Sequence, residues 1–134
     1  MDDIKKQYFR IFDANLNRAR EGLRVIEDTA RFVVGNKNGY KKIRLLRHHI
    51  DKITRAIYPN LLRERNSLED VGRKTKELKR KNLNSILSAN FRRAQESLRV
   101  LEEYSKLISS KSSSSFKEIR FKLYSLEKDF LAQD

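Results

Sequence analysis

Residues 13–28, DANLNRAREGLRVIED, recur as residues 88–103, SANFRRAQESLRVLEE, without a gap and at an offset of 75. Nine of the sixteen aligned positions are identical, which is far more than chance produces. An internal repeat of this kind indicates that one structural unit is present twice. Apolar residues in both copies recur at alternating spacings of three and four, which predicts a helix rather than a strand.

Each copy extends into a hairpin of two helices. The first helix is expected over residues 3–34 and ends at Gly35, where the sequence GNKNG supplies the chain reversal. A second apolar stripe, from Ile43 to Ile57, predicts a second helix. That helix is expected to end around Pro59, because the residue before a proline disfavours the helical conformation.

The second copy predicts a matching pair of helices, one over about 82–109 and one that carries apolar residues from Phe116 to Phe130. With one residue added, the second helix aligns with the fourth, and Arg44 falls on Arg120. We therefore expect an all-α fold. It is a four-helix bundle-like arrangement of two duplicated hairpins, with repeats over about 3–58 and 82–131 in a single domain of residues 1–134.

The connection at 59–81 differs from the helices in its weak periodicity and its charge. The chain has 31 Lys and Arg against 18 Asp and Glu, a net charge of +13. Between Asn36 and Lys81, fifteen Lys and Arg face five Asp and Glu, so about a third of the chain carries a net charge of +10. An irregular basic connection of this length predicts a functional segment with an anionic partner.

Two repeated polar residues fall inside the apolar arc of the first helix. At 100° per residue, Asn15 and Arg18 lie among the apolar side chains, as do Asn90 and Arg93 in the second copy. A buried amide or guanidinium is costly unless it is paired, so either a hydrogen-bonded network that sets helix register or a ligand site explains the recurrence.

Other charged residues of the repeat lie outside this arc. Glu27 and Glu102 fall at the rim of the arc, where an Arg of the opposite repeat is expected to pair with each. The outer face carries Glu21, Arg24, Glu96 and Arg99, whose spacings predict the ordinary surface ion pairs Glu21–Arg24, Arg24–Asp28 and Arg99–Glu103. A second ligand surface or a subunit contact is the alternative for that face.

The sequence RNSLEDVGRK places Arg65, Asp70 and Gly72 together in the connection. A carboxylate beside a flexible glycine and several cations suits either a solvated turn or a site for phosphate or Mg²⁺. On the second predicted helix, Arg44 and Arg47 are candidate phosphate contacts. The adjacent His48 and His49 diverge by about 100° on a helix, so they are not expected to ligate one metal.

Several function classes are excluded by what the sequence lacks. Without cysteine there is no disulfide scaffold, thiolate zinc site or cysteine nucleophile. The motifs GxxxxGK[ST], GxGxxG, GxSxG and HExxH are absent, which argues against common nucleotide-binding, serine-hydrolase and zinc-protease sites. No long apolar run or signal-peptide core is present, so we expect a cytoplasmic protein without a membrane span.

The repeated segments ANLNRAREGLRVIED and ANFRRAQESLRVLEEYSK, with RNSLEDVGRK between them, resemble a small helical domain of thiamine biosynthesis. That domain occurs alone or fused ahead of thiamine-phosphate synthase. The resemblance covers nearly the whole chain and implies an alternative hydroxymethylpyrimidine-phosphate kinase. No β/α barrel of the synthase is present, so this chain is not expected to join pyrimidine and thiazole itself.

The resemblance leads to a specific hypothesis, in which the protein is a phosphotransferase that uses ATP and Mg²⁺ to phosphorylate hydroxymethylpyrimidine phosphate. Arg18, Arg93 and Arg65 would clamp phosphates, and Asp70 or one of Glu27 and Glu102 would hold the metal. Substrate contacts would come from Asn15 or Asn90, which would hydrogen-bond the aminopyrimidine, and from Arg44 and Arg47. Catalysis of this kind is positional and electrostatic.

Two other function classes stay open at this level. A non-catalytic partner or regulatory domain of thiamine-phosphate synthase is suggested by the fusions. A nucleic-acid-binding helical module is suggested by the isoelectric point near 10.2. It is disfavoured because most Phe and Tyr residues lie on apolar stripes and are not interleaved with the basic run. A homodimer is compatible with either class.

Overall fold

The computed structural model describes residues 3–132, which form helices joined by short turns and one long connection. The first half contains α1 (Asp3–Thr29), a π-helical turn η1 (Ala30–Val34), α2 (Lys37–Thr54), α3 (Tyr58–Glu64) and a 3-10 turn η2 (Ser67–Glu69). The second half contains α4 (Leu83–Ile108), a 3-10 turn η3 (Ser110–Ser112) and α5 (Ser113–Leu131). Residues 3–132 include no strand, which confirms the all-α prediction.

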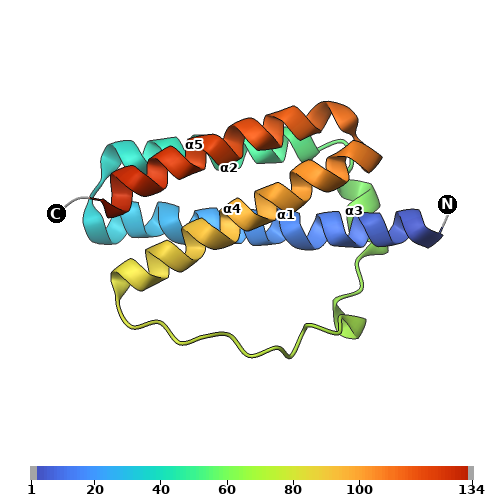
Figure 1. The fold of residues 1–134 in the computed structure, drawn as a ribbon, viewed down its shortest axis with the longest axis horizontal. Helices are drawn as coiled ribbons and strands as arrows, with labels where there is room; N and C mark the ends of the chain where they lie inside the picture. The colour runs from blue at the N-terminus through green and yellow to red at the C-terminus, as the bar shows by residue number, and fades with distance from the viewer. Residues whose placement is uncertain (1–2, 133–134) are drawn as a thin grey trace.

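The two long helices α1 and α4 pack antiparallel against each other, and α2 and α5 cover one side of that pair (Figure 1). The rings of Tyr8 and Tyr104 lie 5.8 Å apart near one end of the α1–α4 contact. Further along α1, a Cβ atom on Gly22 would lie only 3.1 Å from the carbonyl oxygen of Asn90. The missing side chain of Gly22 therefore lets the two backbones approach closely.

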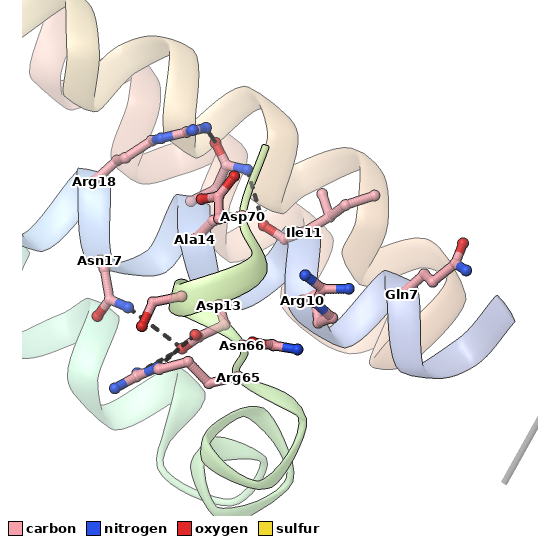
Figure 2. Close-up of a pocket in the computed structure, with 12 residues that line it drawn as sticks. Gln7, Arg10, Ile11, Asp13, Ala14, Asn17, Arg18, Arg65, Asn66 and Asp70 are labelled. Atoms are coloured by element: carbon pink, nitrogen blue, oxygen red, sulfur yellow. Dashed lines mark hydrogen bonds and ion pairs between the residues drawn. The ribbon is translucent and has the colours of Figure 1, made fainter. Parts of the chain in front are cut away.

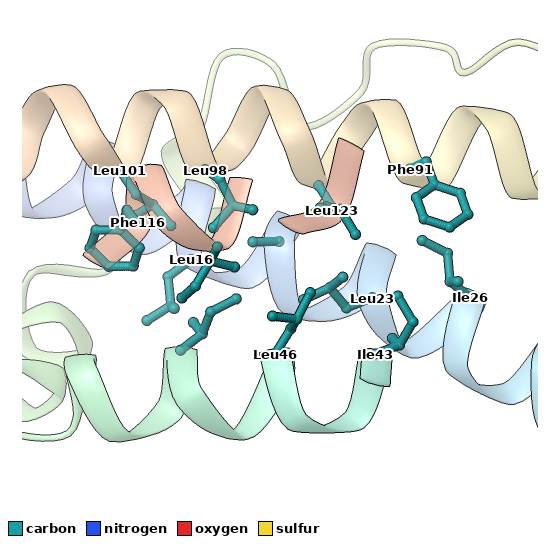
Figure 3. Packing of buried hydrophobic residues seen from close by; sticks show 14 of the residues in the cluster. Leu16, Leu23, Ile26, Ile43, Leu46, Phe91, Leu98, Leu101, Phe116 and Leu123 are labelled. Carbon is teal, nitrogen blue, oxygen red and sulfur yellow. The ribbon is translucent and has the colours of Figure 1, made fainter. Parts of the chain in front are cut away.

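The core is built from matching positions of the two copies. Leu16, Ala19, Leu23 and Ile26 of α1 are fully buried, and so are their repeat equivalents Phe91, Ala94, Leu98 and Leu101 of α4. Figure 3 shows the labelled side chains of α1 and α4 meeting those of α2 and α5. Within the described residues, no helix combines the length and the apolar character needed to cross a bilayer.

The first helix ends at the predicted signal, and a side-chain cap opens the second helix. Gly35 has a φ of +70°, a conformation that glycine adopts without steric cost, and it ends η1 where the sequence predicts the helix to stop. The Asn36 side chain accepts a hydrogen bond of 2.9 Å from the Gly39 backbone N–H. This cap satisfies one of the donors left free at the start of α2.

The prediction for Pro59 needs a correction. α2 ends at Thr54, and Pro59 lies in the first turn of a new helix, α3, within the segment that was expected to be irregular. Proline fits there because the first-turn N–H groups have no partner within the helix. Leu61 of α3 is fully buried, so α3 packs onto α1 before the exposed connection begins.

The alignment of the second helix with the fourth is also corrected. In α2, Ile43, Leu46 and Ile50 are buried, and α5 repeats their spacing with buried Phe116, Ile119 and Leu123. This correspondence has an offset of 73, so Arg120 is equivalent to Arg47 and not to Arg44. The predicted alignment failed because the turn between the hairpin helices is two residues shorter in the second copy.

Candidate functional site

The connection between α3 and α4 lies along the face of α1 and α4 that α2 and α5 leave uncovered (Figure 1). Two hollows form between the connection and the helices. The first, here called the Arg65 hollow, has a volume of about 620 Å³ and is lined by α1 and by residues 65–70. The second, the Arg93 hollow, has a volume of about 700 Å³ and is lined by α1, α4 and residues 70–77.

Arg65 anchors the start of the connection on α1. Its Nε and Nη2 atoms each donate a hydrogen bond of 2.8 Å to the carboxylate of Asp13, whose side chain is only 6% exposed. Hydrogen bonds to Asp13 and then to Tyr58 raise the pKa of the Arg65 guanidinium above its ordinary value. Figure 2 shows the side chains of Asn17 and Arg65 both directed at Asp13. Paired in this way, Arg65 positions the connection.

Arg18 and its repeat equivalent Arg93 are exposed, which contradicts the expectation that both are buried inside the apolar arc. The edge of the arc that carries Arg18 faces both hollows. Arg18 Nη1 donates a long hydrogen bond of 3.4 Å to Oδ1 of the buried Asn15, whose Nδ2 donates to the Ile11 carbonyl at 2.9 Å. Asn15 therefore ties Arg18 loosely to the helix, and Arg18 remains accessible to a ligand.

The Arg93 hollow brings the repeat arginines together, since Arg18 and Arg93 both line it. Arg93 is 3.7 Å from the carboxylate of Glu77, a residue of the connection that is 74% exposed. A pair this long and this exposed to solvent contributes little to stability. Glu21 and Glu96, which the sequence placed on an ordinary surface, line the same hollow. The arginines of both copies thus face one solvent-accessible space.

Asp70 lines both hollows. Its Oδ1 accepts a hydrogen bond of 2.9 Å from the Gly72 backbone N–H, which closes a tight turn. Gly72 and Arg73, two and three residues after Asp70, also line the Arg93 hollow. Asp70 and Gly72 of the sequence RNSLEDVGRK therefore form a tight turn, and this turn lies between the two hollows.

Glu27 and Glu102 have a different environment from the one predicted. Glu27 is 3% exposed and accepts hydrogen bonds from Arg47 at 2.9 Å and from Arg24 at 3.2 Å. In the second copy, Glu102 accepts from Arg120 and Arg99. The expected pairing with an arginine of the opposite repeat is wrong, because each glutamate points toward the second helix of its own hairpin.

The outer face of the repeat carries two of the three surface ion pairs that the spacing predicts. The predicted pair of Glu21 with Arg24 is wrong, because Arg24 contacts Glu27 and Asp28 instead. Arg24 Nε lies 4.0 Å from Asp28, and Arg99 Nη2 lies 3.0 Å from Glu103. Lys106 and then Arg99 hold the pKa of the exposed Glu103 carboxyl below its usual value. These contacts are on the solvent side of α1 and α4.

Three further predicted residues lie apart from both hollows. Arg47 is bound by Glu27 between α1 and α2, and that hydrogen bond raises the pKa of its guanidinium. Arg44 is exposed on α2. Asn90 donates to the carbonyl of Ile86 at 2.8 Å and lines neither hollow. The structure thus gathers Asn15, Arg18, Arg65, Asp70 and Arg93, and leaves the other candidates elsewhere.

Only one of the three predicted metal-binding carboxylates faces the hollows. Mg²⁺ typically takes one or two protein carboxylates together with substrate phosphates. Asp70 fits that requirement. Because α1 and α4 are antiparallel and Tyr8 meets Tyr104, Glu102 lies opposite about residue 10 of α1, which is about 25 Å along that helix from Glu27. Residues 3–132 contain no group of three or more His, Asp or Glu side chains that is arranged to hold a metal.

Some lining residues were missed by the sequence reasoning. Asp13 is the clearest, because its partner Arg65 is 52 residues away. The available signal was a departure from the repeat, since Ser88 stands at the position equivalent to Asp13. Arg10 and Glu77 gave no signal, because an exposed charged residue on a helix or in a basic connection looks like ordinary surface.

Comparison with known proteins places this architecture in a family. The sequence profile of the ThiD2 family matches residues 10–129. The chain belongs to the ThiD2 family. This membership confirms the resemblance carried by the two repeats and the connection. No solved structure matches the chain.

Several curated relatives of this ThiD2 family chain carry the name thiamine-phosphate synthase. One from Prochlorococcus marinus strain AS9601 is 41% identical over 127 residues, which cover 92% of this chain and 35% of the relative. One from Nostoc punctiforme is 38% identical over 133 residues, covering 97% of this chain and 37% of the relative. The chain therefore spans about a third of the length of these curated relatives.

Proposed function

We propose that this protein acts in thiamine biosynthesis as an ATP-dependent kinase that phosphorylates hydroxymethylpyrimidine phosphate. The observation that carries the proposal is the convergence of Arg18 and Arg93, one from each repeat, on a hollow that Asp70 also lines. Membership of the ThiD2 family and the name shared by the relatives support the pathway. The cationic side chains suit substrates that both carry phosphate.

The solvent exposure and the pairing of each side chain indicate its role in the proposed reaction. Arg18 and Arg93 are exposed and weakly paired, so they are available to bind the phosphate oxygens on which negative charge is spread during transfer. Asp70 would hold Mg²⁺ together with those oxygens, and the ion would neutralise part of their charge. Arg65 is a positioning residue, because its pairing with Asp13 holds the connection over α1. Asn15 orients Arg18.

The reaction needs no general base. The acceptor is a phosphate monoester whose second pKa is about 6, so its attacking oxygen is already ionised at neutral pH. That oxygen bonds to the γ-phosphorus of ATP while the bond from the γ-phosphorus to the bridging oxygen breaks, and ADP leaves. Positioning of the two substrates and neutralisation of the phosphate charge are then sufficient for catalysis. The absence of a glycine-rich phosphate loop from the sequence is compatible with binding by arginines.

The direct test is ADP formation that depends on hydroxymethylpyrimidine phosphate. We expect Arg18→Ala and Arg93→Ala to lower kcat/KM by about 100-fold or more, the loss seen when one charge-stabilising donor is removed. Arg92→Ala is the matched control, because Arg92 is an exposed neighbour on α4 that lines neither hollow. Wild-type protein without turnover, or variants equal to wild type, would refute the proposal.

Asp70 is tested separately through the metal. Asp70→Asn keeps the side chain's size and its acceptor for Gly72 but removes the charge. We expect the Mg²⁺ concentration for half-maximal activity to rise by about tenfold, as expected when a directly ligating carboxylate is neutralised. An unchanged Mg²⁺ dependence would remove Asp70 from the metal site.

One observation favours a second candidate function, that of a partner of thiamine-phosphate synthase. The matched relatives bear that name and are about three times as long as the matched segment. A separate chain of this kind would then associate with the synthase. Co-purification of this protein with the synthase, in the absence of ADP formation, would favour this role over catalysis.

A further inference from the structure

The two hollows meet at a common wall, and this suggests a division of labour that rests on the proposed function. We propose that the Arg93 hollow binds the polyphosphate of the nucleotide and that the Arg65 hollow binds the phosphorylated pyrimidine. The reacting phosphates then meet at Arg18 and Asp70, because both residues line both hollows. A kinase requires two substrates held end to end, and two adjoining hollows with one shared charged wall meet that requirement.

The Arg93 hollow has the chemistry of a site for a metal-bound polyphosphate. Arg18, Arg73 and Arg93 line it, and so do the carboxylates of Glu21, Asp70, Glu77 and Glu96. Three guanidinium groups match several phosphate oxygens, and the Asp70 carboxylate can share in binding a divalent cation carried by the nucleotide. The loose contact of Arg93 with Glu77 leaves the guanidinium able to exchange that carboxylate for phosphate.

The Arg65 hollow is less suited to a polyphosphate, because the bidentate pair with Asp13 already occupies two donors of Arg65. The accessible cations in its wall are Arg10 and Arg18. Arg10 has no ion-pair partner within residues 3–132. Two guanidinium groups suit a single phosphate.

The remaining wall of the Arg65 hollow suits a small polar ring. Gln7 supplies an amide, which can both donate to and accept from an aminopyrimidine. Ile11 and Ala14 supply apolar surface for the ring itself. The two hollows thus differ in the number of available arginines, and Gln7 and Ile11 line only the Arg65 hollow.

Separate binding measurements on matched variants test the division. Calorimetry would give the Kd of a non-hydrolysable ATP analogue with Mg²⁺ and the Kd of hydroxymethylpyrimidine phosphate, each alone. We expect Arg93→Gln to weaken the nucleotide analogue by at least about tenfold and the pyrimidine phosphate by less than about twofold, since one charge-assisted contact is lost. Arg10→Gln should show the reverse pattern, and Arg92→Gln should change neither value.

Several results would overturn the division. These are the reversed pattern, equal weakening of both ligands by either variant, and wild-type protein that binds neither ligand.

The proposed function fails in a different way. If each variant weakens only its own ligand but wild-type protein forms no ADP, the two subsites stand and phosphoryl transfer does not. If wild-type protein is active but both variants weaken both ligands equally, the kinase stands and the division fails. Unchanged circular dichroism and Tm would show that the exposed arginine variants fold normally.

Discussion

Arg65 and Asp13, 52 residues apart in the sequence, form a two-point ion pair with both contacts at 2.8 Å. Asp13 lies on α1, and Arg65 follows α3 directly. The pair fixes the point at which the exposed connection leaves the helices. Because residues 66–82 are all exposed, little else anchors this end of the connection.

Breaking this pair should lower stability and loosen the connection. Arg65→Ala leaves the nearly buried Asp13 carboxylate without its main partner, and we expect the free energy of unfolding to fall by about 2 kcal/mol. This loss is smaller than that expected for a fully buried ion pair, because the Arg65 side chain is 33% exposed. Urea denaturation measures the loss. The double variant Asp13→Ser with Arg65→Ala should be less destabilised than Arg65→Ala alone, because no unpaired carboxylate remains. Equal loss in both would argue against the pair.

The buried pair between Arg47 and Glu27 should behave as a structural contact. Arg47→Ala leaves the Glu27 carboxylate, 3% exposed, with only the longer contact from Arg24, and we expect a loss of about 2 to 3 kcal/mol in the free energy of unfolding. Arg44→Ala, one turn earlier and exposed, should change it by less than about 0.5 kcal/mol. If Arg47→Ala instead preserved stability and weakened substrate binding, the sequence-based assignment to substrate would hold.

The close approach at Gly22 limits the size of the side chain that α1 can carry there. A Cβ atom would lie 3.1 Å from the Asn90 carbonyl oxygen and 3.5 Å from the Ala94 Cβ atom, so Val should force the helices apart and cost about 1 to 3 kcal/mol. Gly22→Ala is the control, because a gain of about 1 kcal/mol in helix propensity offsets the tight contact. Thermal denaturation of the three proteins should rank Val clearly below the other two.

The connection should be the first segment that a protease cuts. Arg73, Lys74, Lys76, Lys79, Arg80 and Lys81 are all exposed and lie outside regular secondary structure. We expect trypsin to cleave within 73–81, leaving two fragments that stay together because α1 and α4 share the core. Mg²⁺ with a non-hydrolysable ATP analogue should slow this cleavage. Initial cleavage within α1 or α4 would contradict the arrangement.

The two hairpins show how much of an internal repeat can be recognised from the sequence alone. The match between α1 and α4 was readable because it holds without gaps over residues 13–28 and 88–103. The match between α2 and α5 was placed three residues out of register, because few positions are identical and apolar spacing alone fits more than one alignment. The buried pairs of Glu27 with Arg47 and of Glu102 with Arg120 identify the correct one.

The sequence by itself determined the helices, their buried faces and the duplication, since each of these depends on residues within a few turns of one another. It also marked Arg18, Arg93, Arg65 and Asp70 as residues to examine. Only the tertiary structure decided that Arg18 is exposed, that Glu27 pairs within its own hairpin, and that the connection lies across the open face of α1 and α4. Those features depend on how the helices are offset and on the path of a segment with no apolar pattern, and no local periodicity encodes either.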